Sequence, residues 1–315
     1  MAKRMRRLGI ALGGGLLVTI GGAVWVRATA HARLERTYGT HSIDVPVPYP
    51  GAGDPRATAE GDAMARAIAR GRHLVRSRYG CTECHGDDFG GGTMIDDPAM
   101  GTILGPNLTG GRGSRTRGYT MRAWDRIVRH GVKPDGTPAV MPSEDFARMS
   151  DEELSDIVAF IRSLPPVDRE VPPPSFGPVG LLLVATGKLP LSAETLAARA
   201  EHPARPPRPE PTATFGDHLA QPCRGCHRAD MRGGPIAAGP LDWPPAANLT
   251  PHADGLAGWS YDEFARVMRT GVRPSGRKVR PPMAAVVSFT SKLSDVELRA
   301  LWAYLSSLAP APTGE

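Results

Sequence analysis

Two short stretches of this 315-residue chain hold the same chemically active residues at the same spacing. They read Cys81-Thr82-Glu83-Cys84-His85 and Cys223-Arg224-Gly225-Cys226-His227. Two thiols three positions apart, followed at once by an imidazole, form the pattern that attaches haem covalently. The thiols add to the porphyrin vinyl groups as thioethers, and the histidine binds one face of the iron. Because the chain has no other cysteine, the sequence predicts two haem c groups and no spare thiol.

Three other uses of cysteine pairs remain open. A zinc site built from two such pairs usually has roughly 15–20 residues between them. Cys84 and Cys223 are 139 positions apart, and zinc leaves the two histidines unexplained. A thioredoxin-like redox motif needs a strand–helix–strand context, which the sequence does not show. Two structural disulfides suit an exported protein but give the histidines no role, so haem is favoured.

Net charge does not indicate an anionic partner. The formal charge is +6, but residues 1–27 contain five basic side chains and no acidic one. The remaining chain has 33 basic and 32 acidic side chains, and haem propionates would add negative charge. We therefore expect no nucleic-acid partner, although the sequence pI is about 9.4.

The N-terminus has the pattern of a membrane anchor. A basic cluster precedes Leu8 to Val26, nineteen residues without a charge, and about 20 apolar residues cross a bilayer. We expect residues 1–36 to be a signal anchor with a transmembrane helix in the bacterial inner membrane, and the soluble part to lie in the periplasm. The alternative is cleavage after Ala30 or Ala32, which would release the protein into the periplasm.

The rest of the chain divides into two similar halves. Helical patterns before each haem motif and after each capping box, at Ser150 and Ser294, predict a mainly α fold. The boundaries that we expect are a tether in 37–58, haem domains in 59–166 and 212–315, and a Pro-rich linker in 167–211. His73, His130 and His218 fall near helix ends, where we expect surface or capping residues.

Two methionines are candidates for the second axial position of the irons. Met141 lies 56 residues after His85, and Met283 lies 56 residues after His227. The alternative is that they are core methionines, as we expect for Met268, but two equal displacements favour ligation. Histidine and methionine together saturate the iron, which suits electron transfer. The metal ligands that we predict are therefore His85, Met141, His227 and Met283.

These motifs resemble the class I cytochrome c family. The resemblance implies two tandem cytochrome c domains, in which the Pro106 carbonyl of Gly105-Pro106-Asn107-Leu108 accepts a hydrogen bond from His85. The second half has Ala247 in place of that proline. More narrowly, the two Asn-Leu-Thr segments and the final helices look like cytochrome subunits of membrane-bound alcohol and gluconate dehydrogenases. Those subunits usually carry three haems, whereas this chain has two motifs.

Two functions are consistent with these features. The first is a membrane-tethered electron carrier between a redox donor and acceptor, such as a membrane-bound dehydrogenase or a terminal oxidase. The second is a di-haem enzyme such as a peroxidase or thiosulfate dehydrogenase, which needs one iron with an open site. Because the two methionines match, we predict the electron carrier, with no catalytic residues.

Overall fold

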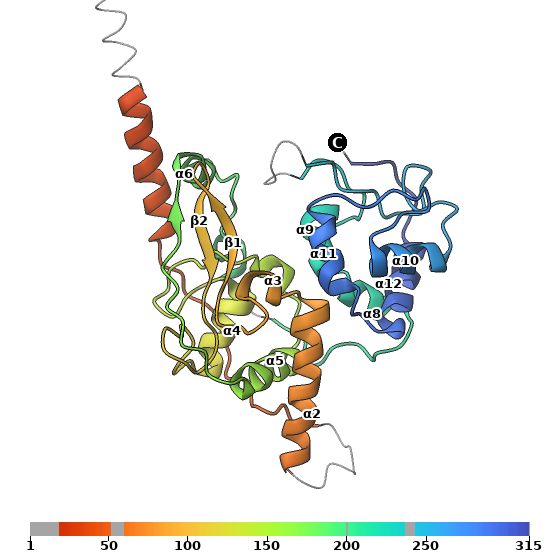
Figure 1. Cartoon of the computed structure of the whole chain (residues 1–315), viewed down its shortest axis with the longest axis horizontal. Helices are drawn as coiled ribbons and strands as arrows, with labels where there is room; N and C mark the ends of the chain where they lie inside the picture. The colour runs from red at the N-terminus through yellow and green to blue at the C-terminus, as the bar shows by residue number, and fades with distance from the viewer. Residues whose placement is uncertain (1–18, 52–59, 200, 237–242, 315) are drawn as a thin grey trace, which may run out of the picture.

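The computed structural model describes residues 19–51, 60–199, 201–236 and 243–314. Figure 1 shows two bodies side by side, the first in orange to green and the second in teal to blue. The first contains α2 (Glu60–His73), a π-helical turn η1 (Leu74–Arg78), α3 (Thr82–His85), β1 (Gly92–Asp97), β2 (Gly101–Gly105), α4 (Met121–His130), η2 (Ser143–Asp145), α5 (Asp151–Ser163), β3 (Ser175–Phe176), α6 (Pro178–Ala185) and α7 (Ala193–Leu196). The second contains α8 (Ala213–Leu219), η3 (Gln221–Cys223), α9 (Arg224–His227), α10 (Tyr261–Thr270), α11 (Met283–Thr290) and α12 (Asp295–Ser307). The predicted pair of largely helical domains is confirmed.

In each domain the helix before the haem motif crosses the C-terminal helix at a glycine. A Cβ atom on Gly71 of α2 would lie 2.0 Å from the carbonyl oxygen of Asp156 in α5. A Cβ atom on Gly216 of α8 would lie 2.0 Å from the carbonyl oxygen of Ala300 in α12. Only glycine allows the two backbones to approach so closely. These crossings fix the direction in which each haem motif leaves its helix.

The local signals for helix ends are confirmed. Ser150 and Ser294 form complete capping boxes with Glu153 and Glu297 at the starts of α5 and α12. In each box the serine side chain accepts a backbone N–H, and the glutamate accepts the N–H of the serine. Gly131 ends α4 with a φ of 67°, the left-handed conformation that glycine adopts without strain.

A small antiparallel sheet in the first domain was not expected. β1 and β2 form a hairpin in which Gly92 pairs with Gly105, and β3 adds at Gly101 and Thr102. The sequence of β1 gives little strand signal because it begins with glycine, ends with two aspartates and faces solvent at most positions. Its order comes from pairing with β2, a contact that sequence pattern does not show.

The segment predicted to be an extended tether is packed where the structure describes it. We call residues 38–50 the strap. Val45 is 3% exposed within the first hydrophobic core, the Ile43 N–H donates to Asp125, and the Ser155 hydroxyl donates to the Pro46 carbonyl. Prolines removed the helix signal, but the apolar residues between them bury against the first domain. Residues 52–59 of the predicted tether lie outside the described residues.

The predicted Pro-rich linker, residues 167–211, also lies against the first domain. The Val167 carbonyl accepts a hydrogen bond from Asn107 at 2.7 Å, and Phe176 pairs with Gly101 in the sheet. Further along, Val184 is fully buried, and His130 Nδ1 lies 3.0 Å from the Leu196 carbonyl. The linker therefore covers the first domain before the chain enters the second.

The N-terminal helix is described over residues 19–34. Ile20, Val24 and Trp25 are more than half exposed on it, and Arg33 joins it to the first domain by pairing with Glu194 at 2.9 Å. Most of the predicted transmembrane segment, Leu8 to Val26, lies outside the described residues. Within the described part of the chain, no helix is long and apolar enough to cross a membrane.

The two domains contact each other through a reciprocal pair of histidines. His218 of α8 lies 3.0 Å from the Glu153 carboxylate of α5, and His73 of α2 lies 2.8 Å from Glu297 of α12. Arg78 also pairs with Glu153 and is itself buried. Glu153 and Glu297 therefore each bind a histidine of the other domain. The expectation that the three helix-end histidines lie at the surface or cap helices is wrong for His218 and for His130, which are both buried.

Candidate haem sites

The first haem motif begins where the π-helical turn ends. Gly80 has a φ of 58°, and the Cys81 N–H donates to the Val75 carbonyl at 2.9 Å, so the chain reverses tightly into α3. Cys81 and Cys84 border a large cavity and are not joined in a disulfide. Burial raises the pKa of Cys81 to about 12, so this thiol is protonated at neutral pH. A redox-active cysteine has a lowered pKa, so the environment does not fit a thioredoxin-like motif.

The histidine of the first motif is oriented by a backbone carbonyl. His85 Nδ1 lies 3.0 Å from the Pro106 carbonyl oxygen, the hydrogen bond that the sequence predicts. Because Nδ1 donates that proton, the lone pair of the ring is at Nε2, where a metal can bind. Burial lowers the pKa of His85, which keeps the ring neutral. Gly105 permits this arrangement because a Cβ atom there would lie 2.0 Å from the Cys84 carbonyl.

The second motif has the same geometry without the proline. His227 Nδ1 lies 2.7 Å from the Ala247 carbonyl oxygen, and burial lowers the pKa of this histidine too. Gly233 provides the room, since a Cβ atom there would lie 2.4 Å from that carbonyl oxygen. Burial raises the pKa of Cys223 to about 12. Ala247 thus takes the place of Pro106 with a backbone oxygen alone.

An asparagine holds each of these carbonyl loops in place. Asn107 accepts hydrogen bonds from the backbone and hydroxyl of Thr109, and its amide donates to Val167. Asn248 makes the same contacts with Thr250 and donates to the Ala311 carbonyl at 2.8 Å. Sequence reasoning treated the repeated Asn-Leu-Thr only as a family resemblance. Both asparagines are almost fully buried and support the carbonyls that orient the motif histidines. The sequence alone did not reveal this role.

A cavity of about 1520 Å³ connects the two motifs. All four motif cysteines, both motif histidines and both candidate methionines border it. Met141 is held by its carbonyl, which accepts a hydrogen bond from Ser192 at 2.9 Å, whereas Met283 is the first residue of α11. Met268 is buried in the second core, as predicted. The site residues therefore fit haem: thiols for the vinyl groups, a neutral imidazole and a thioether in an apolar enclosure.

Basic side chains border the same cavity. They are Arg78, Arg115 and Lys133 in the first domain, and Arg273, Arg277, Lys278 and Arg280 in the second. Haem propionates are anionic, and basic side chains can pair with them. The larger number of basic residues lies beside the second motif.

Each haem motif is covered in part by the other domain. The Ser288 hydroxyl donates to the Glu83 carboxylate at 2.7 Å, and the Phe289 ring lies against Gly80. In the opposite direction, the Gln221 amide donates to the Glu144 carbonyl at 3.0 Å. The residues that follow each candidate methionine thus contact the motif region of the neighbouring domain. The two sites form one unit at the domain interface.

Comparison with known families agrees with this geometry. Residues 66–161 match the family described as cytochrome c oxidase, cbb3-type, subunit III, and residues 214–309 match the cytochrome c family. The chain therefore contains two tandem cytochrome c domains, and it carries two covalently bound haem c groups.

The chain is also similar to individual cytochromes. The cytochrome c subunit of the quinone alcohol dehydrogenase of Gluconacetobacter polyoxogenes is 28% identical over 287 residues, which cover 81% of this chain and 58% of that protein. The gluconate 2-dehydrogenase cytochrome c subunit of Pantoea cypripedii is 28% identical, over 80% of this chain and 62% of its own length. A di-haem c-type cytochrome of Cereibacter sphaeroides is 26% identical, over 72% and 81%. The chain thus spans less than two thirds of the two dehydrogenase subunits. Two of these relatives are named as cytochrome subunits of dehydrogenases and the third as a di-haem cytochrome, which agrees with the prediction of an electron-transfer protein.

Proposed function

We propose that this chain is a di-haem electron carrier that works as the cytochrome subunit of a dehydrogenase. The observation that carries the proposal is the single cavity bordered by both haem motifs. Haem c supplies reversible one-electron redox chemistry. Two such centres in one enclosure allow an electron that enters at one domain to leave from the other.

The side chains around the cavity favour electron transfer over chemistry on a bound substrate. We propose that His85 and Met141 hold the first iron and that His227 and Met283 hold the second. If these four side chains hold the two irons, a substrate would have to displace one of them before it could bind iron. The carbonyls of Pro106 and Ala247 fix the two imidazole rings, so little rearrangement accompanies a change of charge.

A reductive titration tests this role. The purified protein should take up two electrons in two one-electron steps, with both haems low-spin, and should turn over peroxide no faster than free haem peptide. A high-spin haem with rapid peroxide turnover would overturn the proposal in favour of a di-haem enzyme.

For the partner and the location, the support comes from the relatives and the N-terminal helix. Because the relatives include cytochrome subunits of alcohol and gluconate dehydrogenases, we propose that a membrane-bound dehydrogenase donates the electrons. We propose that a terminal oxidase or another respiratory protein accepts them. Ile20, Val24 and Trp25 are exposed on the N-terminal helix, as expected where a chain enters a bilayer. We therefore propose a periplasmic protein tethered to the inner membrane through its first residues.

Membrane fractionation tests the tether. The protein should stay with membranes through an alkaline wash, and its N-terminal residues 1–30 should still be attached. A soluble product that begins at His31 or Arg33 would show that the leader is cleaved.

Co-purification of a dehydrogenase from detergent-solubilised membranes tests the proposed partner. Purification without any dehydrogenase would contradict that partner.

A further inference from the structure

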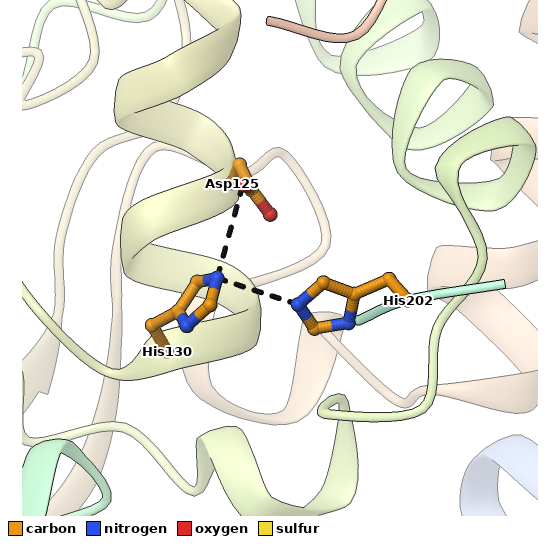
Figure 2. A group of neighbouring side chains, drawn as sticks. All are labelled: Asp125, His130 and His202. Carbon is orange, nitrogen blue, oxygen red and sulfur yellow. Dashed lines mark hydrogen bonds and ion pairs between the residues drawn. The ribbon is translucent and has the colours of Figure 1, made fainter. Parts of the chain in front are cut away.

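A second group of metal-ligating side chains lies away from the haem cavity. Asp125 and His130 extend from α4, and His202 reaches them from the segment after α7 (Figure 2). Their ligand atoms all lie within 4.8 Å of one another. Asp125 and His130 are fully buried, and His202 is partly buried. None of the three borders the haem cavity.

Backbone carbonyls fix the orientation of both rings. His130 Nδ1 lies 3.0 Å from the Leu196 carbonyl, and His202 Nδ1 lies 3.1 Å from the Ala147 carbonyl. Since a carbonyl only accepts, both Nδ1 atoms are donors, and each neutral ring has its lone pair at Nε2. The two Nε2 atoms face each other at 3.3 Å, with Asp125 Oδ2 3.8 Å from His130 Nε2. Three lone pairs that converge in a buried place repel one another unless a cation lies between them.

The charges around the three candidate ligands favour a bound divalent ion. Arg129 is fully buried and pairs with Asp125 at 2.6 Å and with Asp151 at 2.7 Å. One positive charge is thus shared between two carboxylates, so these three side chains together have a net charge of −1.

We propose that Asp125, His130 and His202 bind one divalent transition-metal ion, with zinc the best fit. Metal–nitrogen distances of 2.0–2.1 Å in tetrahedral geometry put two ligand nitrogens about 3.3 Å apart, which matches the separation of the two Nε2 atoms. The carbonyls behind each ring supply the second contact that metal-bound histidines usually have. A water molecule completes the four ligands, as in other zinc sites with three protein ligands.

Such an ion would tie together three segments that are far apart in the sequence. α4 supplies two ligands, and the linker supplies the third. The strap joins through Ile43, whose N–H donates to Asp125 Oδ2 at 2.7 Å. The ion therefore fastens the linker to the first domain just before the chain passes to the second, and it holds the distance between the two haem domains.

The test measures zinc in the full-length protein with both haems attached. After chelator treatment, addition of zinc and desalting, we expect about one zinc for every two irons by elemental analysis. X-ray absorption at the zinc edge should show nitrogen and oxygen neighbours with imidazole scattering and no sulfur. His202→Gln should weaken zinc binding by at least about tenfold while the haem spectrum stays unchanged. Retention of copper or nickel instead would support the same site with another ion of this class.

The matched control is His252→Gln, which removes a histidine from a surface pair with Asp254, 3.5 Å away. It should leave zinc binding unchanged. As a second readout, zinc should slow tryptic cleavage after Arg199 in the original protein but not in the His202→Gln variant. Equal zinc retention by the original protein and the His202→Gln variant, or no retention by either, would overturn the proposal and leave a protonated imidazole as the shared cation.

Discussion

Soon after Met141 the first domain forms the three-residue turn η2, whereas in the second domain Met283 itself begins the eight-residue helix α11. Both segments contact the motif region of the other domain. From α11, the Ser288 hydroxyl donates a hydrogen bond to Glu83, and the Phe289 ring packs against Gly80. The first domain is also enclosed by the strap, the sheet and the linker. In the described part of the second domain, the corresponding covering is only the short C-terminal segment, where the Ala311 carbonyl accepts a hydrogen bond from Asn248 and the Pro312 carbonyl accepts one from Arg232. The second haem site therefore depends more on its neighbour than the first does.

The capping-box glutamates show the same asymmetry in charge. Glu153 is 3% exposed and binds both Arg78, which is 5% exposed, and His218. Apart from its capping-box serine, Glu297 has one side-chain partner among the described residues, His73, which is 40% exposed. The two contacts are related by the repeat, but one is a buried network and the other is half in water. The Glu153 network should therefore contribute more to the free energy of unfolding than the Glu297–His73 pair.

Removal of the buried glutamate should have the largest effect. Glu153→Ala leaves the Arg78 guanidinium buried without its partner, and we expect a loss of about 3–5 kcal/mol in the free energy of unfolding. Glu297→Ala should cost about 1–2 kcal/mol, because His73 can turn to water. Denaturant titration followed by circular dichroism measures both. Glu263→Ala, at an exposed capping box without a cross-domain contact, is the control and should change little. Equal losses at Glu153 and Glu297 would contradict the asymmetry.

Acid should weaken the same contact. Burial alone would raise the pKa of Glu153, but Arg78 and His218 overcome that effect and lower it to about 2. Because the folded-state pKa lies below the unfolded value, this stabilisation is complete above pH ~4.5 and is lost as the pH falls toward 2. The loss should be on the order of 3 kcal/mol. Denaturant titrations between pH 6 and pH 3 should show it, and Glu153→Gln should be less pH-dependent; an identical pH profile for that variant would show that other groups govern acid stability.

Removal of the candidate ligands distinguishes the two haems. Met283→Ala should lower the midpoint potential of one haem by more than about 60 mV, a tenfold change for one electron, and should let that haem bind carbon monoxide. Met141→Ala should do the same to the other haem. Potentiometric titration and the near-infrared methionine–iron band report the result, and the band should fall to half in either variant. If Met283→Ala leaves the band and both potentials unmoved, another side chain binds the second iron.

The smallest effect concerns the carbonyl loops. Pro106→Ala should cost about 0.4–1 kcal/mol, chiefly because the unfolded chain gains freedom, while the hydrogen bond from His85 remains. Ala247→Gly adds similar freedom to the second loop and should cost a similar amount. Thermal unfolding of the two variants compares the loops directly. A shift in haem potential that accompanies only Pro106→Ala would show that the proline also positions the imidazole.

Short-range signals predicted most of what surrounds the haems. The Cys-x-x-Cys-His spacing, the serine and glutamate of the capping boxes and the glycine after α4 act within a few residues, so the sequence reveals them. The sheet, the packed strap and the wrapped linker could not be predicted, because Gly92, Val45 and Val167 gain their order from partners far along the chain. His130 is the last residue of α4, as expected, but it was expected at the surface, because only the fold buries it and brings it within reach of His202.

The contact of Phe289 with Gly80 has a consequence for biogenesis. Enzymes that ligate haem must reach both thiols of a motif, and in the finished protein each motif lies partly beneath the other domain. Ligation on each domain must therefore come first, and closure of the domains second. Maturation of this protein has an order, and a chain that closes before it is loaded should be found as a trapped, colourless by-product.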